Sequence, residues 1–179
     1  YKNFDLSVFI NGSYGNKVYN YLSMKLTHMN SPWTNQLNAV NGRAQLVPIN
    51  PNKVYEDGTM WYNDVSNVMV ANPGASIPRA TINDPNDNDR ISDRYIEDGS
   101  YIRLKNISLG YTFPKKTIDK LGLSNLRIYA NIQNLLTITG YDGYDPEIGA
   151  STSSVNVYGL DNGRYPSPTV YSFGLNVSF

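Results

Sequence analysis

Four segments of the chain alternate regularly between apolar and polar side chains. They span about residues 1–14, 101–113, 126–139 and 169–179. In the final segment, every odd position from Tyr171 to Phe179 is apolar, whereas the even positions carry Ser, Gly or Asn. A period of two sustained over this length is typical of β-strands whose two faces meet different surroundings. We therefore predict an all-β chain built on four strands.

The segment 101–113 departs from strict alternation at one end. Ile107 and Leu109 set the parity of its apolar face, and by that parity Arg103 and Lys105 share the face. In a regular strand, two cations would then stand beside apolar side chains. If the strand crosses a membrane, we expect both cations to lie above the hydrocarbon, where they meet lipid headgroups.

Two all-β architectures fit the alternation. In a soluble, tyrosine-rich β-sandwich that binds carbohydrate, the apolar face packs inward. In an outer-membrane barrel, the apolar face meets lipid and the polar face lines the lumen. The eleven residues of 169–179, tilted by about 45°, span roughly 26 Å, which matches the lipid-facing band of such barrels. Sandwich strands usually have about five or six residues, so strand length favours the barrel.

The connections between the strands are unequal in length. A short turn covers about 114–125, whereas long loops cover about 15–100 and 140–168. Membrane barrels have short periplasmic turns and long extracellular loops, and a periplasmic C-terminus places all three connections consistently. Four strands do not close such a barrel, and unpaired strand edges are costly in lipid. We therefore expect further chain to complete it, because the sequence opens inside a strand pattern.

The composition argues against several classes of site. Lys plus Arg and Asp plus Glu both number 15, so no net charge favours nucleic acid. The chain has no cysteine and a single histidine, His28, which argues against a disulfide framework and a histidine-rich metal centre. The best catalytic set that the sequence offers is His28 with Ser23 or Ser31 and an aspartate, and no nucleophile elbow or pair of carboxylates supports it. We expect no enzyme.

Four stretches of the sequence resemble the C-terminal end of SusC/RagA-type TonB-dependent outer-membrane transporters of Bacteroidota. These stretches are YKNFDLSVFINGSYGNKVYN, SDRYIEDGSYIRLKNISLGYTFP, LRIYANIQNLLTITGYDGYDPEIG and YPSPTVYSFGLNVSF. They occur in the family's order and cover about half of the chain. The resemblance implies the last four antiparallel strands of a plugged transmembrane β-barrel of about 22 strands, with long extracellular loops.

The resemblance also implies a function and a set of partners. Members import glycan oligomers or peptides into the cell across the bacterial outer membrane, using energy relayed by TonB. The implied partners are the remaining barrel and its plug, a SusD-like surface lipoprotein, the TonB complex, the barrel-assembly machinery and outer-membrane lipid. No cofactor is implied. This chain would close the barrel, place its C-terminus in the periplasm and carry extracellular loops.

Two sets of strand residues receive roles from this resemblance. The apolar positions of the last strand are expected to form the signal that the assembly machinery reads, and they also suit simple contact with lipid. They are Tyr171, Phe173, Leu175, Val177 and Phe179. The polar positions of the third strand are expected to face the lumen, where they line the channel or contact the plug. They are Arg127, Tyr129, Asn131 and Gln133.

Three features of the loops are candidates for binding. Trp33, Trp61 and Tyr62 suit contact with substrate or with the lipoprotein, because aromatic faces stack on sugars and anchor protein interfaces; alternatively they pack the loop's own core. Asp84, Asp87 and Asp89 offer hard oxygen ligands for Ca²⁺, but their spacing lacks the glycine and closing glutamate of an EF-hand, and a solvated turn also fits. The stretch GYDGYDPEIG (140–149) is a turn cluster for which we expect a fixed conformation and no chemistry.

Overall fold

The computed structural model describes residues 1–148, 150–151 and 154–179, and these form two compact units. The sheet unit comprises Tyr1–Tyr19 and Ile96–Phe179, and the loop unit comprises Asn20–Tyr95. Of the predicted loop 140–168, residues 149, 152 and 153 lie outside the described residues. In the described part of the chain, no helix has the length and apolar character needed to cross a membrane.

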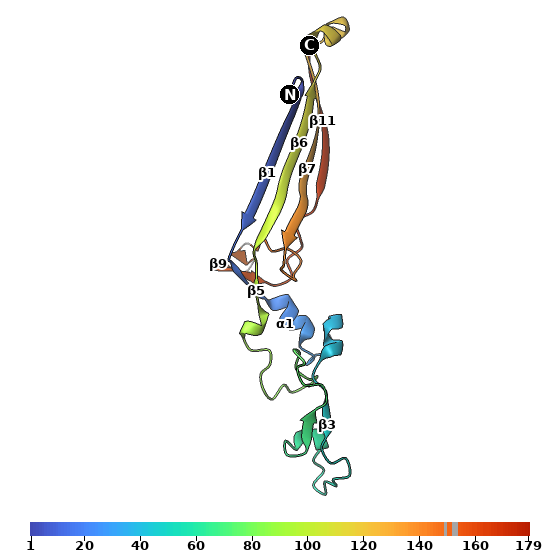
Figure 1. The fold of residues 1–179 in the computed structure, drawn as a ribbon, viewed down its shortest axis with the longest axis vertical. Coiled ribbons are helices and arrows are strands. Elements are labelled where there is room, and N and C mark those ends of the chain that lie inside the picture. Colours follow the sequence, from blue (N-terminus) through green and yellow to red (C-terminus); the bar gives the residue numbers. More distant parts are fainter. Residues whose placement is uncertain (149, 152–153) are drawn as a thin grey trace. The chain divides into compact units, whose positions relative to one another are not determined.

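A four-stranded antiparallel sheet forms the body of the sheet unit (Figure 1). Its strands lie side by side in the order β1, β6, β7 and β11. They are β1 (Phe4–Ser13), β6 (Tyr101–Thr112), β7 (Asn125–Thr139) and β11 (Val170–Ser178). Each strand occupies one of the four alternating segments. Both β1 and β11 have a free edge among the described residues, because each pairs with one neighbour only.

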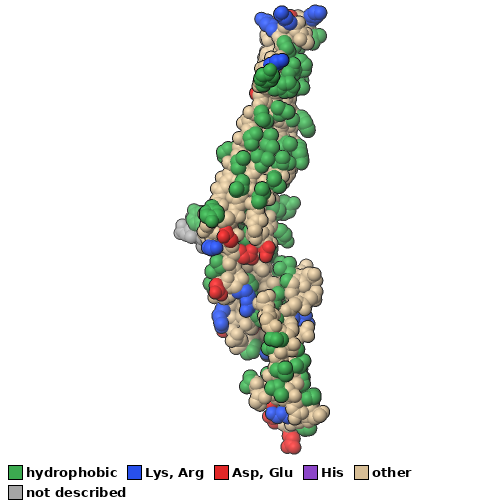
Figure 2. Space-filling model, viewed as in Figure 1, with side chains coloured by type: hydrophobic (Ala, Val, Ile, Leu, Met, Phe, Trp, Pro, Cys, Tyr) green, Lys and Arg blue, Asp and Glu red, His purple; other side chains and the backbone are tan. Residues whose placement is uncertain are grey.

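The register of the sheet brings the apolar positions of all four strands onto one face. Leu6, Leu109, Ala130 and Phe173 form one cross-strand row on this face. The exposed fraction is 66% for Leu6 and 84% for Phe173, so no second sheet of the described chain covers them. Apolar side chains spread along the sheet in Figure 2. A continuous exposed apolar face is unfavourable in water and suits contact with lipid.

A β-bulge at Lys105 reverses the two faces along β6. The register shifts here against both neighbouring strands, and Lys105 itself has no cross-strand partner. Beyond the shift, Leu104 pairs with Ile10 on the apolar face, while Arg103 turns to the polar face. The expectation that Arg103 lies among apolar side chains at the headgroups is therefore wrong. One extra residue in a strand exchanges the directions of the side chains that follow it.

The connection between β6 and β7 is a compact helical turn. After Pro114 the chain forms α2 (Lys115–Ile118) and a 3-10 turn, η4 (Asp119–Leu121). Gly122, with φ of +70°, ends it in the left-handed conformation that suits glycine. The side chain of Ile118 is buried beneath the turn. Figure 1 shows both chain termini at this end of the sheet, which we call the turn end.

The opposite end of the sheet, the loop end, carries a second small sheet. Strands β2 (Lys17–Asn20), β5 (Ile96–Asp98) and β10 (Leu160–Asp161) pair in the order β10, β2, β5. A further antiparallel pair is formed by β8 (Ala150–Ser151) and β9 (Ser154–Tyr158). Among the side chains of the sheet unit that the structure describes, the buried apolar ones, apart from Ile118, lie at or near this end, and they are Val18, Tyr101 and Tyr141. The described sheet unit therefore packs its core around the loop end and leaves both faces of the large sheet open.

The loop unit contains short elements joined by turns. Its helix α1 (Tyr21–Thr27) begins where Asn20 Oδ1 accepts a hydrogen bond from the Ser23 amide over 2.8 Å, as an N-cap does. Two short strands, β3 (Leu46–Pro48) and β4 (Val68–Val70), pair with each other. Its 3-10 turns are η1 (Asn38–Gly42), η2 (Trp61–Asn63) and η3 (Asp93–Tyr95). The buried apolar side chains of this unit are Met24 and Tyr95, and its buried polar side chains are Asn20, Thr27, Asn67 and Asp84.

Candidate functional site

A buried ion pair fastens the 140–148 segment to β6 at the loop end. Arg103 Nη2 donates to Asp145 Oδ1 over 2.5 Å, and both side chains are at least nine-tenths buried. The same guanidinium donates to Glu147 Oε2 over 2.8 Å and to Thr137 Oγ1 over 2.8 Å. Lys105 at the bulge reaches the other oxygen of Glu147 over 2.5 Å. The bulge thus directs both cations of β6 toward this segment.

Asp145 also orders the backbone on both sides of it. Its carboxylate accepts hydrogen bonds from the amides of Glu147 and Ser167, each over 2.9 Å. Burial raises the pKa of Asp145, but the hydrogen bonds from Arg103 and from these amides outweigh it and hold the pKa below its ordinary value. The carboxylate therefore stays charged and holds Ser167, just before β11, close to the 140–148 segment.

A second buried contact holds the same segment. Tyr141 donates its hydroxyl proton to Asp161 Oδ2 over 2.6 Å, and both side chains are buried. Burial, followed by the hydrogen bond to Asp161, raises the pKa of Tyr141. Asp161 in turn accepts from the amide of Gly163 over 2.9 Å. These contacts give the described part of 140–149 a defined conformation.

The polar face of the large sheet carries a bridge that spans three strands. Arg127 on β7 donates from Nη2 and Nε to the two oxygens of Asp5 on β1, over 2.6 and 3.2 Å. Gly110 of β6 lies between them, and a Cβ there would collide with both charged groups. The Arg127 guanidinium also lies 5.0 Å from the ring centroid of Tyr129. A glycine therefore leaves room for an ion pair between strands that are not neighbours.

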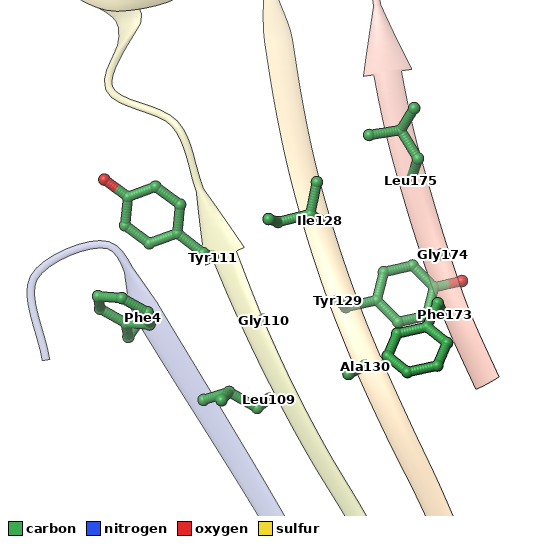
Figure 3. Close-up of a pocket in the computed structure, with 10 residues that line it drawn as sticks. All are labelled: Phe4, Leu109, Gly110, Tyr111, Ile128, Tyr129, Ala130, Phe173, Gly174 and Leu175. Carbon is green, nitrogen blue, oxygen red and sulfur yellow. The ribbon is translucent and has the colours of Figure 1, made fainter. Parts of the chain in front are cut away.

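The four residues predicted to face the lumen share this polar face. Arg127, Tyr129 and Asn131 are half-buried, whereas Gln133 is exposed. Figure 3 shows the Tyr129 ring extending from β7 toward Gly174 of β11. A groove of about 520 Å³ lies on the opposite, apolar face, lined mainly by side chains such as Leu109, Ala130 and Phe173, and Tyr129 is the one residue of the four that lines it. That the polar face lines a lumen stays a prediction.

A hollow of about 670 Å³ lies beside Trp61 and Tyr62 in the loop unit. The two rings meet edge to face with centroids 5.7 Å apart, at the start of η2. Trp61 is half-buried and Tyr62 is 41% exposed. Besides the aromatic pair, the polar residues that line the hollow are Arg43, Gln45, Asn63, Arg79, Thr81 and Asn83. We call this cavity the Trp61 hollow.

Hydrogen bonds hold two walls of the Trp61 hollow. Asn72 clamps the wall that contains Gln45, because it accepts from the Gln45 amide over 2.8 Å and donates to the Arg43 carbonyl over 2.9 Å. Asp64 fixes the turn after Trp61. It accepts from Lys53 over 2.5 Å, from Tyr55 over 2.9 Å and from the backbone and hydroxyl of Ser66. The cavity is therefore shaped by bonded side chains.

The remaining loop candidates are placed differently. Trp33 is 93% exposed, so it does not pack a core of the described chain. Asp84 and Asp89 gather around His28, with Asp84 Oδ2 3.0 Å from Nε2 and Asp89 Oδ2 3.9 Å from Nδ1. Asp87 is not part of this group.

The Asp84 carboxylate is already engaged by protein groups. Its two oxygens accept from the backbone amide of Asn88 over 2.5 Å and from its side chain over 2.6 Å. Burial raises the pKa of Asp84, but these bonds and the contact with His28 outweigh it and lower the pKa. The calcium site stays a prediction, and any ion bound there would compete with these contacts and meet an imidazole, which Ca²⁺ does not favour.

The apolar positions of the last strand point away from the polar row. The exposed fractions are 61% for Tyr171, 84% for Phe173, 61% for Leu175, 38% for Val177 and 93% for Phe179. Phe179 lies just beyond the end of β11 at Ser178. This placement agrees equally with lipid contact and with an assembly signal, so the signal role stays a prediction.

Several residues of these sites are not predicted by the sequence analysis. The face of Arg103 is predicted wrongly, although the change of parity between Leu104 and Ile107 is a sequence pattern that indicates a bulge. For Asp5, the sequence shows only a polar position in a strand and nothing that indicates an ion pair. Arg43 and Arg79 stand 36 positions apart in unpatterned loop sequence, and only the fold brings them to one cavity.

Comparison with known proteins finds TonB-dependent receptors among the relatives of this chain. TonB-dependent receptor P3 of Formosa agariphila is 34% identical over 184 residues, which covers the whole chain and 15% of that protein. TonB-dependent receptor P26 of the same organism is 32% identical over 187 residues, covering the whole chain and 16% of the relative. TonB-dependent receptor SusC of Bacteroides thetaiotaomicron is 36% identical over 93 residues, 51% of the chain and 8% of its own length. No family model matches the chain.

Solved structures share the fold. The RagAB peptide importer in its closed-closed state matches with a TM-score of 0.64 and 19% identity, covering all of this chain and 16% of that one. A second structure of the RagAB peptide transporter matches with a TM-score of 0.64 and 18% identity, covering 99% and 16%. These likenesses confirm the predicted fold class, antiparallel strands of a large transmembrane barrel, and leave the soluble sandwich without support. The chain spans about a sixth of these proteins.

Proposed function

Because this chain belongs to the SusC/RagA type of TonB-dependent receptors, we propose that it forms part of the wall of an outer-membrane importer for glycan oligomers or peptides. The single observation that carries the proposal is the identity of 34% over the whole chain to a TonB-dependent receptor. The fold supports it, since the sheet exposes an apolar face suited to lipid and has free edges on β1 and β11. The remainder of the barrel would pair with both edges.

Each end of the sheet has a role in this proposal. The turn end, with the chain's C-terminus, faces the periplasm, and the loop end faces the outside. The polar face with Arg127 and Tyr129 lines the lumen or contacts the plug. The ion pair between Arg103 and Asp145 holds an extracellular loop in place, so that the opening presents a defined surface to substrate. We expect no catalytic role for any of these residues.

The partners follow from the same proposal. A SusD-like lipoprotein would cap the barrel from outside and contact the loop unit, for which Trp33, 93% exposed, is the candidate anchor. Ligand would bind between cap and plug. The TonB complex would then drive a rearrangement of the plug, and the lumen would open. The assembly machinery would read the apolar positions of β11 that end in Phe179.

Uptake in living cells tests the proposal. Cells that lack the gene would be compared with wild type for growth on single oligosaccharides and peptides as sole nutrient, and for uptake of the same compounds carrying a fluorescent label. The expected result is loss of growth on at least one oligomer, with uptake that stops when the proton gradient is collapsed. Uptake that survives collapse of the gradient would indicate a passive porin and refute the TonB-driven importer.

A further inference from the structure

The Trp61 hollow is lined by cations without acids. Its lining residues include Arg43 and Arg79, and none of them is Asp or Glu. The loop unit does contain carboxylates, but Asp64 binds Lys53 and Asp84 binds His28. In a chain with equal numbers of acidic and basic residues, the cavity therefore stands out as a site for negative charge.

The two guanidinium groups retain donors for a ligand. Arg43 gives one hydrogen bond from Nη1 to the Val40 carbonyl over 3.2 Å. Arg79 is half-buried, and among the residues that the structure describes its side chain has no hydrogen bond or ion pair. An arginine offers five N–H donors in a planar fork that matches carboxylate or sulfate. A half-buried guanidinium without a protein partner gains most from an anion that enters the cavity.

The other lining groups indicate the chemistry that would carry this anion. Trp61 and Tyr62 supply aromatic faces, against which the apolar faces of sugar rings pack. Gln45, Asn63 and Asn83 supply amides, which both donate and accept hydrogen bonds as sugar hydroxyls require. The volume of about 670 Å³ lies within the usual range for sites that bind small ligands, and it is larger than a single ion would fill.

We propose that the Trp61 hollow binds an acidic sugar residue of an oligosaccharide, with Arg79 and Arg43 on the acidic group and Trp61 against the ring. This inference rests on the proposed function and deepens it, because it assigns to the importer a glycan substrate that carries carboxylate or sulfate. The site lies in the segment 15–100, which the proposed function assigns to the extracellular side, so the importer would select by charge at the cell surface.

Binding to the purified full-length transporter tests the site. Isothermal titration in detergent would use tetragalacturonate as the carboxylate probe, a sulfated carrageenan tetrasaccharide as the sulfate probe and maltotetraose as the neutral one. We expect one or both acidic probes to bind and maltotetraose to bind at least tenfold more weakly. Arg79→Gln should weaken acidic binding by about tenfold to a hundredfold, the usual effect of losing a charged hydrogen-bond partner. The matched control is Arg94→Gln, an exposed arginine outside the hollow, which should bind as wild type does.

The outcomes separate the site from the transport function. Failure of both acidic probes to bind wild type, equal binding of maltotetraose, or equal weakening by Arg94→Gln would overturn the acidic-sugar site. Tetraglutamate that binds as tightly as the sugars, with the same dependence on Arg79, would overturn it in favour of a peptide site. In each of these cases gradient-dependent uptake would still uphold the importer. Binding that follows Arg79 without such uptake would uphold the site and refute the importer.

Discussion

The ring of Tyr129 on β7 covers the backbone of Gly174, its direct partner on β11 (Figure 3). A Cβ at Gly174 would collide with the hydroxyl end of the ring, so the glycine is required by a side chain on the neighbouring strand and not by its own backbone conformation. The same row continues to Gly110, over which Asp5 meets Arg127. The two glycines thus allow large polar side chains to lie flat against the polar face of the sheet.

The first prediction concerns this row. Gly174→Ala should lower the free energy of unfolding by about 1–3 kcal/mol, because the Tyr129 ring has to leave its position. Gly110→Ala should cost less, since it displaces only the flexible ends of Asp5 and Arg127. Urea unfolding of the full-length transporter in detergent measures both. Gly42→Ala is the control, because a Cβ there meets open space; an equal loss at Gly42 would contradict the explanation.

The second prediction concerns the buried pair at the loop end. Arg103→Gln should destabilise the sheet unit by about 3–5 kcal/mol, because Asp145 is left as an unpaired buried charge. Hydrogen exchange should accelerate across 141–148, which the pair fastens. Lys17→Gln, which breaks an exposed pair with Asp98, is the control and should leave exchange unchanged.

A double variant tests whether the stranded charge of Asp145 causes the loss of stability in Arg103→Gln. Adding Asp145→Asn to Arg103→Gln removes the stranded charge, so the double variant should be more stable than Arg103→Gln alone. A double variant that is less stable, by the sum of the two single losses, would show that the two groups act independently.

The third prediction concerns acid pH and Asp84. Its pKa is lowered in the folded state, so the stability it contributes is present above the ordinary value of about 3.9 and is lost as pH falls through the folded pKa. The Asn88 amide, which donates to Asp84, should therefore lose protection from exchange between pH 5 and the acid range below the lowered pKa. The Asn50 amide, which donates to the neutral side chain of Asn67, serves as control. Equal loss at both amides would point to general unfolding.

The fourth prediction tests Trp33 as an anchor for the lipoprotein. Trp33 is 93% exposed in the described chain, and a tryptophan that serves as the hot spot of an interface contributes about 2 kcal/mol or more. Trp33→Ala should therefore weaken binding of the lipoprotein about thirtyfold or more, measured by biolayer interferometry on the purified transporter. Val65→Ala, another exposed apolar site in the loop unit, should have little effect. Unchanged affinity for Trp33→Ala would place the interface elsewhere.

The fifth prediction separates the assembly signal from lipid contact. Phe179→Ala should reduce the amount of folded transporter in the outer membrane severalfold without changing the unfolding midpoint of the molecules that do fold, because a signal acts only during assembly. Heat-modifiable mobility on gels measures the amount of folded transporter, and urea unfolding in detergent measures the midpoint. A lowered midpoint with normal amounts would instead assign Phe179 to lipid contact. Asn176→Ala, on the polar face of β11, is the matched control.

The positions of the four strands and the separation of their two faces were readable from the sequence, because alternation is a property of neighbouring residues. Phe173 and Leu175 reveal an apolar face without any knowledge of what packs nearby. The resemblance to SusC/RagA transporters was likewise local to the strands and their flanks. Both results depend on short-range patterns, which a single sequence contains in full.

The change of parity in β6 is visible in the sequence, but the tertiary structure alone placed the bulge that causes it and decided which loop residues meet. The bulge at Lys105 reverses the direction of Arg103, and the partner of Arg103, Asp145, stands 42 positions away. The approach of Arg79 to Trp61 depends in the same way on turns fixed by distant hydrogen bonds, such as those of Asn72. A local period does not encode contacts between segments so far apart, since these depend on how the intervening chain returns.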